Sequence, residues 1–167
     1  MIHHPGFLFN WIGGGQMKQQ TLLMFAVIAL FVLLGPLTST AQEAPPVSND
    51  GLLLHVSHAA DDPHRVLMPL SLAMKMSGAM PVRLFFDIEG VKVLAKDGPN
   101  LTHEGFEKGS KELIAELLKK PNVSIHICPM CMKAAGMTEA DLLDGVVVAN
   151  PKTFTGFTDG RIVTLDW

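Results

Sequence analysis

The apolar positions of the chain fall into two alternating patterns from Gly51 onward. Short apolar runs predict five strands, at residues 52–56, 81–88, 123–128, 146–149 and 161–165. Between them, apolar positions three and four apart predict helices at residues 63–77, 102–120 and 138–144. Strands that alternate with helices indicate an α/β fold with a parallel, layered sheet and right-handed crossovers.

Two of the strand segments are apolar almost throughout. Residues 52–56 contain a single histidine, and residues 146–149 contain no polar side chain. This composition is typical of strands that are covered on both faces, as in parallel sheets. We therefore expect both strands to lie in the interior.

The predicted helix at residues 63–77 has two apolar stripes. One consists of Val66, Leu70, Ala73 and Ser77, and the other of Met68, Leu72 and Met76. A helix that is apolar on nearly all sides needs a second surface to pack against. We expect the second stripe to contribute to a subunit interface.

The amino-terminal segment has the pattern of a secretory signal. Lys18 precedes an uninterrupted apolar run at residues 22–34, and the small residues Ser39, Thr40 and Ala41 follow it. The run is shorter than the roughly 20 residues that span a bilayer. We expect a signal peptide at residues 17–41, membrane contact only through this segment before its cleavage near Ala41, and a periplasmic or secreted product.

The segments on either side of this signal carry no core pattern. Residues 1–16 precede Met17, which begins a conventional signal, and we interpret them as a mis-assigned upstream start. Residues 42–50 contain Pro and Ser and predict a flexible tether. Residues 51–167 are long enough for one domain with its own core.

The composition argues against several classes of function. The net charge is −3, aromatic residues make up 7%, and no run of basic residues occurs, so nucleic-acid binding has no support. No phosphate-binding glycine loop and no Ser-His-Asp pattern is present, which disfavours nucleotide binding and hydrolysis. No cofactor is predicted.

Both cysteines of the chain lie where a strand pattern changes to a helix pattern. Cys128 ends the run at residues 123–128, Pro129 suits a first helical position, and Gly136 suits the left-handed residue that ends a short helix. Free backbone N–H groups at a helix start favour a thiolate. Cys131 follows at the Cys-x-x-Cys spacing, at which a second thiol is able to attack a disulfide on the first. Cys128 is the leading candidate for chemistry, and a buried structural thiol is its alternative.

Other side chains near the cysteines are weaker candidates. His126 shares strand parity with Cys128 and is a candidate base, although a mid-strand histidine is more often part of the core. His58, after the first strand, is placed to face the cysteine across neighbouring strand ends. Met130 and Met132, together with the two thiols, would suit Cu(I).

Taken together, residues 51–148 resemble the DsrE/DsrF/TusD family of sulfur-relay and related proteins. The resemblance is carried by the opening strand, the phenylalanine-rich second strand, the strand that ends in Cys128 with Gly136 eight residues later, and the Gly145-Val146-Val147-Val148 segment. It implies a three-layer flavodoxin-like sandwich, commonly assembled as a homotrimer or hexamer.

The resemblance also implies a chemistry. In sulfur-relay members the cysteine at this position carries a persulfide, and Cys128 matches it. We expect Cys128 to accept sulfane sulfur and pass it on, with a sulfur donor or acceptor protein or a small thiol as partner, and Cys131 to release the sulfur or regenerate the thiol. The alternative is a soft-metal or thiol-redox module that uses Cys128 and Cys131 without sulfur transfer.

Overall fold

The computed structural model describes residues 48–167. The upstream segment, the signal peptide and most of the tether lie outside these residues. In chain order the elements are β1 (Gly51–Val56), α2 (Pro63–Met76), β2 (Val82–Phe86), the 3₁₀ helix η1 (Ile88–Leu94), α3 (Ser110–Leu117), β3 (Val123–Ile127), α4 (Pro129–Ala134), the 3₁₀ helix η2 (Glu139–Asp141), β4 (Val147–Val148), α5 (Pro151–Thr155) and β5 (Ile162–Asp166).

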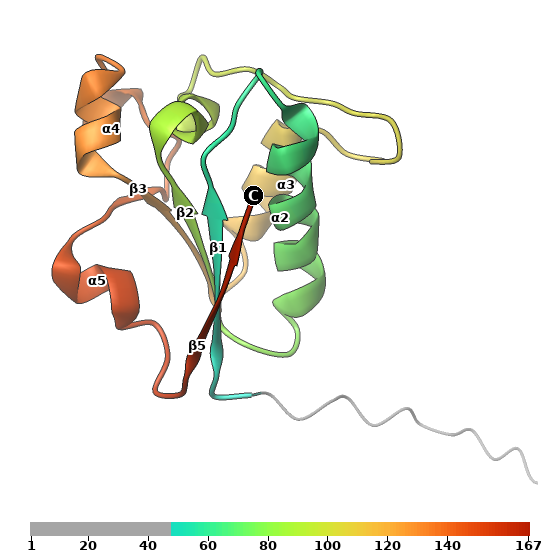
Figure 1. Cartoon of the computed structure of the whole chain (residues 1–167), viewed down its shortest axis with the longest axis vertical. Coiled ribbons are helices and arrows are strands. Elements are labelled where there is room, and N and C mark those ends of the chain that lie inside the picture. The colour runs from blue at the N-terminus through green and yellow to red at the C-terminus, as the bar shows by residue number, and fades with distance from the viewer. Residues whose placement is uncertain (1–47) are drawn as a thin grey trace, which may run out of the picture. The chain divides into compact units, whose positions relative to one another are not determined.

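The five strands form one sheet in the order β4-β3-β2-β1-β5, and every neighbouring pair is parallel. The register aligns Val56 with Phe86 and Phe86 with Ile127, so β1, β2 and β3 end at the same level. Helices lie on both sides of this sheet, with α2 and α3 on one side and α5 on the other (Figure 1). The predicted α/β fold with a mostly parallel five-stranded sheet is confirmed.

The core lies between the sheet and the helices α2 and α3. Alternate residues of the three central strands point into it and are buried, namely Leu52, Leu54, Val56, Val82, Leu84, Phe86, Ile125 and Ile127. The predicted first stripe of α2 packs against them, and Val66, Leu70 and Ala73 are fully buried. The second stripe is only partly covered, since Met68 is 38% exposed. Its role as a subunit interface stays a prediction.

The opposite face of the sheet buries polar side chains under α5. Arg83 of β2 donates from Nε to the Ser124 hydroxyl at 2.9 Å, and from Nη1 to the carbonyl oxygens of Thr153 and Phe154. Its guanidinium also lies over the Phe157 ring, 4.5 Å from the centroid. A buried cation thus satisfies carbonyl groups at the end of α5 and holds that short helix on the sheet.

The expectation that residues 146–149 are covered on both faces is wrong. β4 contains only Val147 and Val148, and Val147 is 39% exposed. β4 lies at the edge of the sheet and pairs with β3 alone, so little packs against it. β5 forms the other edge, and all five of its residues are exposed.

Two predicted helices are shorter than expected. The helix predicted at residues 102–120 is α3, and it begins only at Ser110. Residues 101–109 form a loop instead, in which the Leu101 N–H donates a hydrogen bond to the Ser110 hydroxyl at 2.9 Å. The helix predicted at residues 138–144 is one 3₁₀ turn, η2. By contrast, the start of α2 is as predicted: Asp62 accepts the N–H of Arg65 at 3.2 Å, and Pro63 is the first helical residue.

Among residues 48–167, no helix combines the length and the hydropathy needed to cross a membrane.

Candidate functional site

Cys128 lies where the sequence predicts it, between β3 and α4. Its N–H donates to the carbonyl oxygen of Phe86 at 2.9 Å, which extends the pairing of β3 with β2 by one residue. Its own carbonyl oxygen accepts the N–H of Met132 at 2.9 Å and begins α4. Pro129 is the first helical residue, and Gly136, with φ +73°, follows the end of the helix as predicted. Cys128 is half-buried and free at the carboxyl edge of the sheet, where α/β proteins place their sites.

Cys131 is the second free thiol and lies one helical turn later on α4. It is half-buried and packs against the apolar core. Burial raises the pKa of its thiol, the nearby Ile88 N–H opposes that rise, and the Cys128 thiol and the Asp87 carboxylate add to it. The two thiols therefore act on each other, and Cys131 is held toward its protonated form.

The turn that follows β2 brings backbone and carboxylate groups to the same place. Ile88 has φ 45°, a left-handed conformation that is unfavourable for a β-branched residue. Gly90 lies so close to the end of β1 that a Cβ atom there would be 2.3 Å from the carbonyl oxygen of Val56. This tight turn fixes Asp87, whose position continues the register beyond Phe86 and corresponds to Cys128 beyond Ile127.

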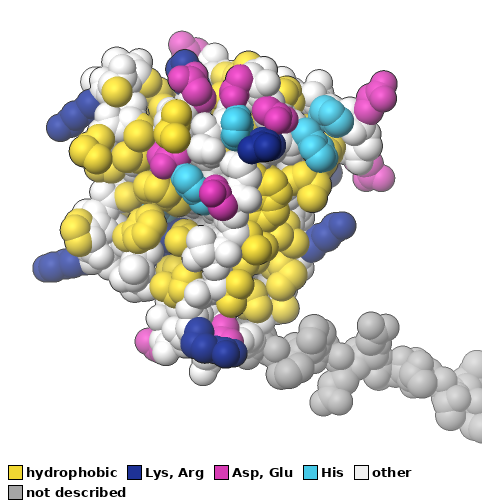
Figure 2. All heavy atoms as spheres, viewed as in Figure 1, with side chains coloured by type: hydrophobic (Ala, Val, Ile, Leu, Met, Phe, Trp, Pro, Cys, Tyr) yellow, Lys and Arg dark blue, Asp and Glu magenta, His cyan; other side chains and the backbone are white. Residues whose placement is uncertain are grey.

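A chain of three charged or polar side chains ends at Asp87. His55, at the carboxyl end of β1, places Nε2 2.8 Å from Asp87 Oδ1 and Nδ1 2.7 Å from Asp166 Oδ1. Asp166 belongs to β5, so these three side chains reach from an edge strand to the centre of the sheet. The side chain of Asp87 is 19% exposed and that of Asp166 is 73% exposed. Figure 2 shows acidic and histidine side chains gathered at this end of the described residues.

His126 is deeply buried in β3, with only 2% of its surface exposed. Burial, and then the positive charge of Arg83, lower its pKa from 6.5 to about 4. Its Nδ1 has no hydrogen-bond partner among the described residues. An imidazole that holds a proton so weakly is a poor base for a thiol, and His126 fits better as a core residue of the α5 face.

The other candidates from the sequence lie in separate surroundings. His58 places Nδ1 2.6 Å from Asp61 Oδ2, and its Nε2 lies 3.4 Å from an Arg65 nitrogen, in an exposed loop. Met132 is buried in the core, whereas Met130 is 77% exposed, so the two thioethers lie on different sides of α4. Among residues 48–167, no group of three or more His, Cys, Asp or Glu side chains is arranged to hold a metal ion.

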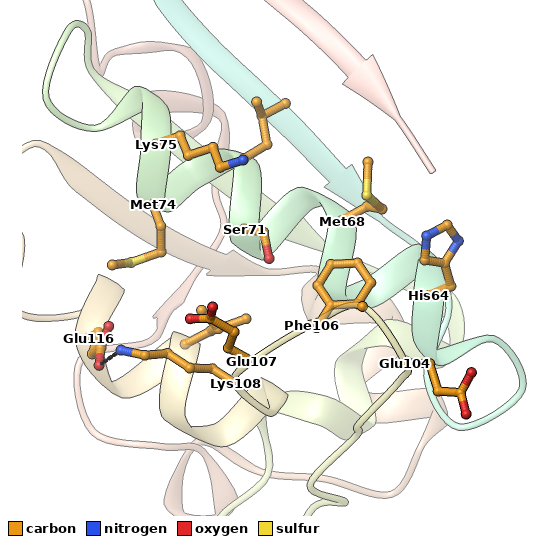
Figure 3. A pocket seen from close by; sticks show the side chains of 13 residues that line it. His64, Met68, Ser71, Met74, Lys75, Glu104, Phe106, Glu107, Lys108 and Glu116 are labelled. Atoms are coloured by element: carbon orange, nitrogen blue, oxygen red, sulfur yellow. Dashed lines mark hydrogen bonds and ion pairs between the residues drawn. The ribbon is translucent and has the colours of Figure 1, made fainter.

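A separate open pocket of about 770 Å³ lies between α2 and α3. Figure 3 shows His64 and Met68 on α2 facing Phe106 across it, with Lys108 bonded to Glu116 on the far wall. The His64 and His103 rings are tilted by 32° with their centroids 4.9 Å apart, and the Phe106 ring meets the His64 ring edge-on. Neither cysteine lines this pocket.

The predicted site residues did not include three members of the site, namely His55, Asp87 and Asp166. His55 sits inside an apolar strand, and Asp166 lies in the last strand, 111 residues away. The signal that could identify them is parity: His55, Asp87 and Cys128 all point away from the core face. Only the pairing of β5 with β1, which no local pattern encodes, brings Asp166 to His55.

Comparisons with known proteins identify the fold and the family. The model of the DsrE/DsrF-like family matches residues 52–160. The structure of MTH1491, a protein of unknown function from Methanobacterium thermoautotrophicum, is similar with a TM-score of 0.53 and 20% identity, over 70% of this chain and 98% of that one. YchN from E. coli is similar with a TM-score of 0.51 and 16% identity, over 70% of this chain and 99% of that one. No curated protein matched the sequence. Because the family model covers more than half of the chain, this protein belongs to the DsrE/DsrF-like family.

Proposed function

We propose that this protein is a sulfur carrier in which Cys128 accepts sulfane sulfur, holds it as a persulfide and passes it to an acceptor thiol. Membership of the DsrE/DsrF-like family suggests sulfur relay in general terms. The observation that supports the specific role is the position of Cys128, a free and half-buried thiol at the carboxyl end of a central strand. There it is accessible to a small donor and partly sheltered from water.

The proposed chemistry needs only thiols and sulfane sulfur. The Cys128 thiolate attacks the outer sulfur of a donor persulfide, a new S–S bond forms, and the donor leaves as a thiolate. An acceptor thiolate then attacks the outer sulfur of the Cys128 persulfide and regenerates the Cys128 thiolate. One sulfur atom moves in each step, the number of S–S bonds is unchanged, and no external oxidant or reductant is required.

Mass spectrometry after incubation with an inorganic polysulfide tests this function. We expect one added sulfur on the wild-type protein, none in Cys128→Ser, and one still present in the matched variant Cys131→Ser. An acceptor thiol added afterwards should remove that sulfur and carry it away as its own persulfide. Equal labelling of the wild type and Cys128→Ser would contradict the proposal, and so would tight Cu(I) binding without any sulfur uptake.

We also propose that the protein works after export, as a homotrimer or hexamer. The apolar run at residues 22–34 and the small residues that follow it support export. The partly exposed second stripe of α2, with Met68, supports association of subunits. Cell fractionation and the solution mass of the purified protein test these two points, and a cytoplasmic protein or a monomer would contradict them.

A further inference from the structure

The chain Asp166–His55–Asp87 lies at the same sheet edge as the two thiols. Its two contacts, at 2.7 Å and 2.8 Å, have the length of hydrogen bonds to charged groups. His55 Nε2 and Asp87 Oδ1 are both buried and lie 2.8 Å apart, but neither atom has a hydrogen-bond partner among the described residues, so this contact is close without being aligned as a hydrogen bond. The carboxylate of Asp87 therefore packs against a ring that Asp166 holds from the far side by a hydrogen bond.

The Asp87 carboxylate and the two thiols belong to neighbouring elements at the carboxyl edge of the sheet. Asp87 directly follows Phe86, whose carbonyl oxygen accepts the N–H of Cys128. Helix α4, which carries Cys131, packs against η1, which begins at the residue after Asp87. The titratable groups that surround Asp87 are thus His55 from β1, the two cysteines from the β3–α4 segment and, behind His55, Asp166 from β5.

A negative charge fixed beside a thiol disfavours its ionisation, and only the thiolate attacks sulfur. Burial is the main cause that raises the pKa of the Cys131 thiol, and the charge of Asp87 adds to the rise. This matters because Cys131, one turn from Cys128, is the nearest thiol that could discharge a persulfide on Cys128.

We propose that Asp87 protects the Cys128 persulfide from discharge by Cys131, and that His55 and Asp166 are positioning residues that keep the Asp87 carboxylate beside the thiols. The proposal rests on the proposed function. It assigns to Asp87 the choice between delivery of sulfur to an acceptor and its loss as hydrosulfide.

The reaction that Asp87 restrains is balanced without a further reactant. The Cys131 thiolate attacks Cys128 Sγ, the bond between Cys128 Sγ and the outer sulfur breaks, and a Cys128–Cys131 disulfide forms. The electron pair of the broken bond leaves on the outer sulfur, which departs as hydrosulfide and takes up a proton from water. The Cys131 sulfur is oxidised to the disulfide level, Cys128 Sγ stays at that level, and the outer sulfur is reduced to sulfide.

Asp87 is better placed for this role than the other carboxylates near the site. Glu89 pairs with Lys92 and is half exposed, so water screens its charge, whereas the side chain of Asp87 is only 19% exposed. Asp61 is bonded to His58 in a separate loop. Glu89→Gln is accordingly a matched control, since it removes a carboxylate two residues away from Asp87 without touching the chain to His55.

The test uses the full protein loaded with one sulfur from polysulfide and then freed of donor. The rate of hydrosulfide release without an acceptor is measured between pH 6 and pH 9, together with the mass of the disulfide product. We expect Asp87→Asn to release hydrosulfide about threefold faster than the wild type at pH 7, with a pH profile displaced to lower pH. Glu89→Gln should follow the wild type, and Cys131→Ser should abolish release in both backgrounds.

Asp166→Asn provides a second variant at an exposed side chain, should Asp87→Asn fold poorly. This variant should also release hydrosulfide faster than the wild type, by a smaller factor than Asp87→Asn, and its fold should stay unchanged. Release at the wild-type rate or slower in either variant would overturn the proposal while leaving the sulfur carrier intact. Failure of the wild-type protein to take up sulfur in the loading step would overturn both.

Discussion

The two faces of the sheet bury different kinds of side chain. The face under α2 and α3 is lined by aliphatic and aromatic residues such as Leu54, Leu84 and Phe86, all fully buried. The face under α5 carries His55, Arg83 and His126, with carboxylates and thiols at its carboxyl edge. Apolar burial stabilises the first face, whereas the second keeps polar groups in fixed positions at a cost in desolvation. The comparison indicates that one face makes the fold and the other makes the site.

The largest effect should come from the apolar face. Leu84→Ala removes a fully buried side chain from the central strand β2. The lost transfer free energy and the cavity left behind should lower the free energy of unfolding by about 4 kcal/mol. Chemical denaturation measures this, and a loss below about 1 kcal/mol would show that the core is not packed as described.

A pH effect should follow from His126 on the polar face. Its pKa is lowered from 6.5 to about 4 in the folded protein, so between these values the unfolded chain binds a proton that the folded one does not. The free energy of unfolding should therefore be highest above pH 6.5 and should fall by about 3 kcal/mol as the pH decreases to 4.

Denaturation at pH 7 and at pH 4.5 checks this effect. The control is His126→Gln, which cannot titrate and should lose less stability over the same interval. An equal loss in both proteins would assign the pH effect to other groups.

A somewhat smaller effect is expected for Arg83. Arg83→Met keeps an unbranched apolar stem but leaves the carbonyl oxygens of Thr153 and Phe154 without their donor. We expect a loss of about 2 kcal/mol and faster hydrogen exchange confined to α5. Arg161→Met, which removes an exposed pair with Asp50, is the control and should change little.

The smallest effect is expected at the edge of the sheet. Val163 of β5 is 48% exposed, so Val163→Ala should change the free energy of unfolding by less than about 0.5 kcal/mol. A larger loss in the purified protein would mean that this strand is covered in solution, and its dependence on protein concentration would identify an association of subunits.

The fold could be predicted largely from local patterns, and the site only in part. The strand that ends in Cys128, the caps Asp62 and Gly136 and the buried stripe of α2 follow from residues close in sequence, and the structure has them as expected. The exposure of Val147 could not be predicted, because it depends on the place of β4 at the edge of the sheet. The predicted helix at residues 102–120 begins too early because Phe106, which lies in the loop, is four residues before Ser110 and so continues the helical spacing.

The site residues that could not be predicted are those whose contacts depend on the pairing of strands far apart in the sequence. His58 was preferred over His55 because it follows the strand, whereas the register turns His55 toward Asp87 and Asp166. His126 was correctly placed on the same sheet face as Cys128, but its burial beside Arg83 could not be derived from the spacing.

The central claim is that Cys128 carries sulfur, and the most direct test is the location of that sulfur in the protein. The wild type and Cys131→Ser, treated with polysulfide, alkylated and digested, should each carry one additional sulfur on Cys128 in the peptide that spans residues 123–133. Sulfur found only on Cys131, or a Cys128 that stays unmodified in both proteins, would contradict the account.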